Sequence, residues 1–248
     1  MPQFLLFRLY GPMAAWGDIA VGEQRPTTPH PSKSAILGLI AAALGIRRHE
    51  DARLQTLAES YGYAVRVDAG GVLLRDYHTT QIPESTSRLK HLHTRRDETR
   101  DRGNQYTVLS SRDYRIDALF TVCLAKQDGA PYPLEELADH LRLPRLPLYL
   151  GRKSCPLALP LLPSCIAADN FETALQRYDA GGSAAQQEQF QQIRRALGAE
   201  HATPDYYWET GMTDTLPLHT TPRQDVPLNR RRWQFGKRNE HYRRGEAS

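Results

Sequence analysis

The chain has 248 residues, of which 40% are hydrophobic and 24% are charged. This length can bury one large core, and this composition is that of a globular protein, which excludes wholesale disorder. The three cysteines form no C-x-x-C pair, which argues against a zinc ribbon or a disulfide framework and favours a reducing compartment. No stretch has the length and hydropathy of a membrane span or the pattern of a signal peptide, so we expect a soluble, cytoplasmic protein.

The positive charge is unevenly distributed along the chain. Residues 1–153 carry 21 Lys/Arg against 17 Asp/Glu, residues 154–222 carry 3 against 8, and residues 223–248 carry 8 against 3. Of the 32 cations, 27 are arginine, a residue that forks onto phosphate oxygens and stacks on bases. Two basic regions flanking an acidic one favour an anionic polymer, RNA or DNA, as the partner.

The first elements predict a strand followed by two helices. Residues 4–9, FLLFRL, predict a buried strand, and residues 10–17 predict a loop because two glycines and a proline fall there. Residues 32–46 predict a helix with Ser32 as its N-cap and with apolar residues at helical spacing. Residues 50–61 predict a second, more polar helix.

Strands dominate the next part of the chain. Residues 63–68 and 71–80 predict two strands joined across glycines, and residues 106–111 and 114–126 predict two more. A short amphipathic helix is predicted at 133–141.

This order of elements is close to a β-α-β-β-α-β unit. We therefore expect the α+β class, with a ferredoxin-like domain over residues 1–168 and an inserted hairpin, or thumb, at 79–113. Such a sheet is the platform of RNA-recognition modules, although the fold also hosts unrelated activities.

The C-terminal region over residues 169–248 differs from the rest in composition and periodicity. Residues 171–178 and the glutamine-rich 184–197 predict helices. The segment 223–248 has little periodicity and many arginines, so we expect a flexible basic arm whose deletion spares the fold.

Ser32, Lys33 and Ser34 stand at the start of the apolar helix. Free backbone N–H groups and the helix dipole meet there and make an anion site, to which Lys33 adds a formal charge. The alternative is an ordinary capped helix with a surface lysine. The chain has no Walker A motif, so the site is not a nucleotide-binding P-loop.

Two further features allow both a binding and a structural interpretation. Trp16 stacks on a base if it is exposed and belongs to the core if it is buried. The insertion at 79–113 carries seven Lys/Arg and five Asp/Glu. It is either a finger that grips a nucleic-acid backbone, a salt-bridged solvated face or a disordered loop.

The sequence gives little support for catalysis or a metal site. His91-x-His93 has no cysteine or ordered acid at supporting spacing, so a zinc site is not expected. His30, His78 and Tyr10 have the chemistry of an acid–base ribonuclease, yet nothing in the sequence orients them together. We expect no enzymatic activity, no metal and no cofactor.

Residues 146–160, LPLYLGRKSCPLALP, place one glycine and two cations between apolar flanks. Gly151 permits a left-handed turn or a close backbone approach, Tyr149 offers a ring, and Arg152 and Lys153 offer charge. The pattern suits the bend of a polynucleotide, and the alternative is a basic surface turn.

Four stretches, RLYGPMAAWG, RPTTPHPSKSAILGLIAAALGI, LRDYHT and YLGRKSCPL, resemble in order and spacing the signature stretches of the CasD family of type I-E CRISPR Cascade subunits. The resemblance spans residues 4–165 and implies a modified RNA-recognition fold of the repeat-associated RNA-binding group. It implies that the thumb clamps the 5′ handle of the guide RNA (crRNA), without cleavage. The implied neighbours are the Cascade backbone subunits and the large subunit, which inspects target DNA.

The resemblance also implies a set of RNA-contact residues. They are Trp16, Arg25, Ser32, Lys33, Arg47, Arg75, His78, Arg88, Lys90, Arg112, Tyr149, Arg152 and Lys153. Lys33, Arg152 and Lys153 carry the most weight in this set. Two rival functions stay open: a metal-independent endoribonuclease that processes CRISPR repeat RNA, and an autonomous DNA-binding regulator.

Overall fold

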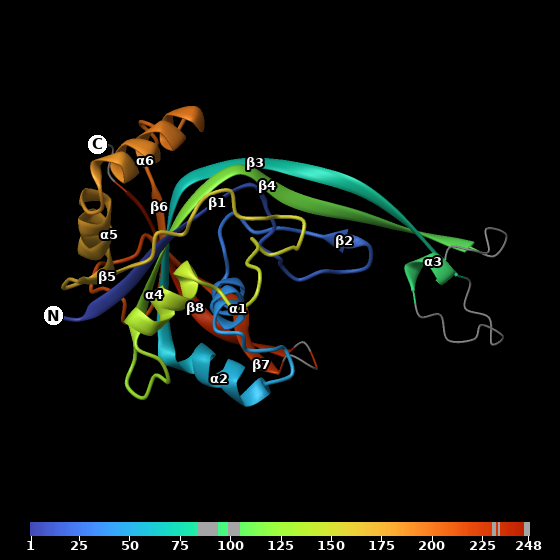
Figure 1. Ribbon diagram of the computed structural model, residues 1–248, viewed down its shortest axis with the longest axis horizontal. Helices are drawn as coiled ribbons and strands as arrows, with labels where there is room; N and C mark the ends of the chain where they lie inside the picture. Colours follow the sequence, from blue (N-terminus) through green and yellow to red (C-terminus); the bar gives the residue numbers. More distant parts are fainter. Residues whose placement is uncertain (84–93, 99–104, 230–231, 233, 246–248) are drawn as a thin grey trace.

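One sheet forms the centre of the molecule (Figure 1). The computed structural model describes residues 1–83, 94–98, 105–229, 232 and 234–245, and within them the sheet has eight strands. Their order is β5-β1-β4-β3-β6-β8-β7, with β2 paired to β4 outside this path. β2 and β4 are parallel, and the other pairs are antiparallel. The bounds are β1 Gln3–Ala14, β2 Gln24–Arg25, β3 Tyr61–Pro83, β4 Gln105–Lys126, β5 Ser164–Ala167, β6 Asp205–Glu209, β7 His219–Asn229 and β8 Gln234–Arg244.

Helices cover both faces of the sheet, and α1, α2 and α4 lie on the face opposite α5 and α6 (Figure 1). The five helices predicted from the sequence are confirmed, and the coarse α+β class with them. None of the helices in the described ranges is long and apolar enough to cross a membrane. The bounds are α1 Lys33–Ala43, α2 Asp51–Ser60, α3 Arg95–Glu98, α4 Leu134–Arg142, α5 Phe171–Ala180 and α6 Ala184–Ala196.

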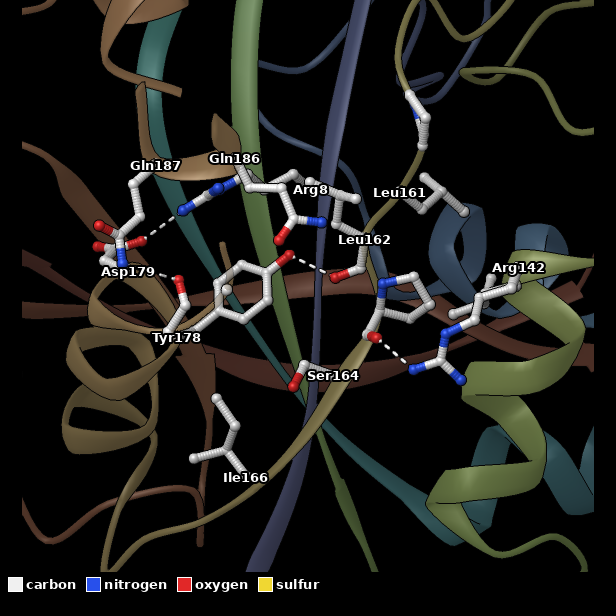
Figure 2. A pocket seen from close by; sticks show the side chains of 15 residues that line it. Arg8, Arg142, Leu161, Leu162, Ser164, Ile166, Tyr178, Asp179, Gln186 and Gln187 are labelled. Atoms are coloured by element: carbon white, nitrogen blue, oxygen red, sulfur yellow. Dashed lines mark hydrogen bonds and ion pairs between the residues drawn. The ribbon is translucent and has the colours of Figure 1, made fainter. Parts of the chain in front are cut away.

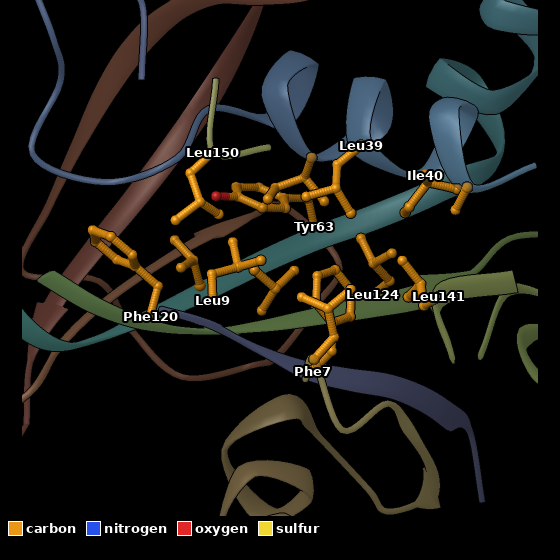
Figure 3. Close-up of a cluster of buried hydrophobic side chains, with 14 of the residues drawn as sticks. Phe7, Leu9, Leu39, Ile40, Tyr63, Phe120, Leu124, Leu141 and Leu150 are labelled. Carbon is orange, nitrogen blue, oxygen red and sulfur yellow. The ribbon is translucent and has the colours of Figure 1, made fainter. Parts of the chain in front are cut away.

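The larger core lies between the sheet and α1, α2 and α4. Phe7 from β1 and Phe120 from β4 are fully buried, and they face Leu39 and Ile40 of α1 across this layer (Figure 3). Removal of this apolar surface from water is the main force that holds the helices on the sheet.

Three predicted strand boundaries are wrong, and one of them is the break expected between residues 106–111 and 114–126, which form one strand, β4. β1 continues to Ala14 through the expected loop at 10–17, and the two strands expected at 63–68 and 71–80 are one strand, β3. A bulge between Val67 and Ala69 shifts the register of β3 without ending it. Gly71 (φ +62°) suits this place because a Cβ atom there would lie 2.2 Å from the carbonyl oxygen of Ile116.

β3 and β4 pair continuously from Tyr61 opposite Lys126 to Pro83 opposite Gln105. Beyond Gly70 most side chains of β3 are exposed, and the two strands project from the body as a ribbon (Figure 1). We call residues 70–83 and 105–118 the hairpin arm. The expected insertion at 79–113 is the outer part of this arm, and its residues 84–93 and 99–104 lie outside the described part of the chain.

The expected flexible arm at 223–248 is a wrong prediction. β6 pairs with β3, β8 pairs with β6, and β7 closes this edge of the sheet. The pattern was missed because β7 contains two prolines and two register shifts, which hide the alternation of a regular strand. The domain boundary expected at 168 stays a prediction.

Buried charges attach β7 and β8 to α1. The carboxylate of Asp225 accepts hydrogen bonds from Arg238 Nε (2.7 Å) and Nη2 (2.8 Å) and from the backbone N–H of Lys33 (2.9 Å). Lys33 Nζ donates to Glu209 Oε2 at 3.0 Å, and Arg238 Nη2 donates to Glu240 Oε2 at 2.7 Å. The side chains of Lys33, Asp225, Arg238 and Glu240 are at most 11% exposed, so each charge depends on its partners for stability.

We expect Arg238→Ala to lower the free energy of unfolding by about 3–5 kcal/mol, because it leaves two buried carboxylates without their main cation. Urea unfolding followed by circular dichroism measures the change. The matched control is Arg195→Ala, because Arg195 pairs with Glu200 at 3.1 Å while its side chain is 63% exposed. The control should lose at most about 1 kcal/mol. Equal, small losses in both variants would contradict this account of the C-terminal strands.

His30 extends the same network. It is 1% exposed, its ring is stacked on Tyr207 with centroids 3.9 Å apart, and its Nε2 lies 3.2 Å from Glu240 Oε1. Burial alone raises the pKa of Glu240, but the hydrogen bond from His30 and the charges of His30, Arg238 and Arg223 outweigh it and lower that pKa to about 2.

This lowering makes the stability depend on pH in a defined window. A carboxylate whose folded-state pKa lies below its ordinary value of 4.5 stabilises the fold above that value, and the contribution disappears as the pH falls toward 2. We expect Glu240→Gln to lower the free energy of unfolding by roughly 3 kcal/mol at pH 7 and by little at pH 2.5. Denaturant titrations at the two pH values measure this. A difference that is independent of pH would be inconsistent with the assignment.

Candidate nucleic-acid interface

The root of the hairpin arm brings together several cations that are far apart in sequence. The parallel pairing of β2 with β4 places Arg25 opposite Arg112, and on the other side of β4 the residue opposite Arg112 is Asp76. The next pair along this ladder is Arg75 with Asp113. Of the predicted contact residues, Arg25, Arg75 and Arg112 lie on the paired strands of this root, and Arg152 is hydrogen-bonded to it.

Asp113 is the centre of the root. Its carboxylate accepts hydrogen bonds from Arg75 Nε (2.8 Å) and Nη2 (3.1 Å), and the bond from Arg75 holds its pKa below the ordinary value. Its main-chain carbonyl accepts a hydrogen bond from Arg152 Nη1 at 3.0 Å. Sequence reasoning did not select Asp113, because its role appears only when the register of β3 and β4 is known.

The turn that carries the two adjacent cations is packed against the loop after β1. The carbonyl of Leu150 accepts a hydrogen bond from the N–H of Ala15 (2.9 Å), and the N–H of Leu150 donates to the carbonyl of Cys155 (2.7 Å). Gly151 has φ +87°, and a Cβ atom there would lie 1.9 Å from the carbonyl oxygen of Ala15. Both expected uses of this glycine, a left-handed turn and a close backbone approach, are therefore confirmed.

Arg152 and Lys153 have different surroundings. Arg152 is half-buried: Nη2 donates to the carbonyl of Arg25 at 3.0 Å, and the guanidinium lies over the ring of Tyr114, 4.6 Å from its centroid. Lys153 is exposed. Tyr149, on the same turn, is 38% exposed.

The start of α1 at Ser32 and Lys33 is an anion site, but the anions that it binds are carboxylates of the protein itself. Ser32 caps α1 by accepting from the N–H of Ala35 at 3.2 Å, as predicted. The backbone N–H of Lys33 binds Asp225 and its side chain binds Glu209, so a buried lysine replaces the expected surface cation. An RNA phosphate cannot reach this site without displacing β7.

Trp16 also lies away from any external surface. It is 1% exposed, and its ring meets Phe120 edge-on at 5.6 Å. The core interpretation of Trp16 therefore holds, and the stacking interpretation is wrong.

The remaining predicted residues have different environments. Arg47 is exposed after α1, and His78 on the arm lies 3.7 Å from Asp76. Arg88 and Lys90 lie outside the described residues, so they stay predictions.

A pocket of about 460 Å³ lies between the end of α4, the segment 160–164 and the junction of α5 and α6 (Figure 2). Arg8 lines it and donates to Asp179 at 2.8 Å. Burial raises the pKa of Asp179, but Arg66 and Arg8 outweigh it and lower the pKa below the ordinary value. On the opposite rim Arg142 donates to Asp139 and to the carbonyl of Pro163. These cations are already neutralised inside the protein, so the pocket does not favour a phosphate.

The described residues include no group of three or more His, Cys, Asp or Glu side chains that could hold a metal ion. His91 and His93 fall outside these residues. The three candidates for acid–base chemistry lie in separate contacts: His30 binds Glu240, His78 lies beside Asp76, and Tyr10 packs near α6.

Comparison with known proteins agrees with this architecture. The model of the family described as CRISPR-associated protein (Cas_Cas5) matches residues 4–240. The CRISPR system Cascade subunit CasD of Escherichia coli (strain K12) is 38% identical over 191 residues, which are 73% of this chain and 80% of that protein.

Two solved structures are similar over nearly the whole chain. A chain of a CRISPR RNA-guided surveillance complex has a TM-score of 0.64 at 27% identity, with 98% of this chain and 90% of that chain covered. A crystal structure of a Cas protein has a TM-score of 0.62 at 27% identity, with 97% and 94% covered. The chain therefore belongs to the Cas5 family of CRISPR-associated proteins, and it is a CasD-like member of that family.

We expect Gly151→Ala to displace the turn, because the new Cβ atom overlaps the carbonyl of Ala15 and the residue must also keep a positive φ. The matched control is Gly22→Ala: Gly22 also has a positive φ, +57°, but open space surrounds its Cβ position. We expect Gly22→Ala to cost about 1–2 kcal/mol of unfolding free energy and Gly151→Ala to cost clearly more. Equal losses in thermal unfolding would contradict the close approach.

Proposed function

We propose that the protein is a non-catalytic subunit of the CRISPR Cascade surveillance complex that caps the 5′ handle of the crRNA. The observation that carries this proposal is the root of the hairpin arm, where strand pairing and the hydrogen bonds of Arg152 bring β2, β3, β4 and the 146–160 turn together, and this turn also carries the partly exposed Tyr149. Cations bind phosphates, and an accessible ring provides a stacking surface for a single-stranded base. In this proposal Arg25, Arg112 and Lys153 bind the RNA backbone.

The fold supports a ferredoxin-like unit with a thumb. The sheet contains the order β5-β1-β4-β3, in which all neighbours are antiparallel. The helices α1 and α2 connect β1 to β3, and α4 connects β4 to β5, as in a β-α-β-β-α-β unit. In this interpretation the hairpin arm is the thumb, and the RNA passes along its root.

The relatives support the place of the protein in a larger assembly. One of them carries the name of a Cascade subunit, and a similar chain is part of an RNA-guided surveillance complex. We propose the Cascade backbone subunits and the large subunit as direct partners in the cytoplasm, with target DNA as an indirect one.

A binding experiment with the full-length chain tests the proposal. A single-stranded RNA that carries the repeat-derived handle of the host CRISPR locus is titrated in EDTA, and the same RNA with a scrambled handle is the control. We expect binding without cleavage and a preference for the handle. The variant Arg112→Ala/Lys153→Ala should bind more weakly and with a flatter salt dependence, by about 1.4 in the slope of log K against log salt.

Two outcomes would overturn the proposal. Specific cleavage of the RNA would favour the endoribonuclease. Tight binding of duplex DNA with no preference for the handle would favour a DNA-binding regulator.

A further inference from the structure

Arg152 and Lys153 are neighbours in sequence but differ in what they contact. The guanidinium of Arg152 joins three segments: the carbonyl of Asp113 in β4, the carbonyl of Arg25 in β2 and the ring of Tyr114. In the described part of the chain Lys153 makes no comparable contact, and its side chain faces solvent.

The geometry of Arg152 requires an arginine. Its Nη1 and Nη2 donate to two different carbonyls, each at 3.0 Å, while its flat face rests on an aromatic ring. A planar fork satisfies all three contacts at once, whereas an ammonium group is a point charge that has neither the fork nor the face.

These contacts determine where other cations of the root stand. β2 is only two residues long, and its main-chain attachment to the arm includes the bond from the N–H of Ser111 to the carbonyl of Glu23 at 3.0 Å. Such a short strand forms few ladder bonds of its own, and the bond from Arg152 Nη2 to the carbonyl of Arg25 adds to its attachment. The Arg25 guanidinium is held on the same segment, because its Nη1 donates to the carbonyls of Gly22 (2.6 Å) and Gln24 (2.9 Å), so its position depends on that of β2.

We infer that Arg152 is a positioning residue and that Lys153 is the residue of this pair that binds phosphate. Arg152 holds β2 and the 146–160 turn against the arm, so that Arg25, Arg112 and Lys153 face one RNA backbone. This inference rests on the proposed function and assigns separate roles within the same site.

Charge-preserving substitutions separate the two roles. Arg152→Lys keeps the positive charge but loses the planar guanidinium that donates to two carbonyls. If Arg152 binds phosphate, the lysine should preserve RNA binding; if Arg152 positions β2, it should not. We expect Arg152→Ala and Arg152→Lys both to weaken binding of the handle RNA by about tenfold, with the salt slope unchanged. We expect Lys153→Ala to lower the slope by about 0.7 and Lys153→Arg to restore it.

Hydrogen exchange supplies a readout that does not depend on RNA. The Ser111 amide should exchange faster in both Arg152 variants and normally in Lys153→Ala, because Arg152 is hydrogen-bonded to β2 and to β4, whereas Lys153 faces solvent. The control is the Gln127 amide, bonded to the carbonyl of Ser60 at 2.9 Å at the other end of the ladder, which should not change.

Three results would overturn the inference: wild-type affinity in Arg152→Lys, a slope change in Arg152→Ala equal to that of Lys153→Ala, or unchanged exchange at Ser111. If the wild-type chain binds no handle RNA, the proposed function fails. In that case exchange at Ser111 still decides whether Arg152 positions β2.

Discussion

The arrangement of the chain depends on one interaction: the carboxylate of Asp225 accepts a hydrogen bond from the N-terminus of α1. A helix N-terminus attracts an anion, and here the anion comes from a strand 192 positions further along the chain. Because Arg238 neutralises the same carboxylate, β7 and β8 are attached to the helical layer as well as to the sheet. The N-terminal and C-terminal parts of the chain therefore form one structure.

This internal use of the helix start affects where RNA can bind. The anion site predicted at the start of α1 is filled by Asp225, so the RNA contacts that we propose lie at the root of the hairpin arm instead. There Gly151 lets the turn approach Ala15, and Asp113 orients Arg75 and Arg152. The location of the proposed interface thus follows from two packing constraints rather than from the density of positive charge along the sequence.

Helices and local turns were predictable from the sequence, and long-range pairings were not. The helical spacing at 32–46, its Ser32 cap and the left-handed turn at Gly151 depend on neighbouring residues, which are visible in the sequence. The continuity of β3 through a bulge depends on β4, and β7 depends on β8, so glycines and prolines there were misread as breaks. The burial of Lys33 has the same origin, because its partners Asp225 and Glu209 come from strands that the sequence pattern did not reveal.

The cationic side chains of this protein can act in two physical ways, and the root of the hairpin arm offers an example of each. A guanidinium that donates to backbone carbonyls, as Arg152 does, stabilises irregular segments whose own ladders are short. A cation that faces solvent gains its binding energy from phosphate and counterion release instead. A basic composition alone does not distinguish these uses, since both raise the net charge equally. The distinction comes from what each side chain already contacts, and it leaves Lys153, which the sequence ranked beside Arg152, as the freer of the two to meet an RNA.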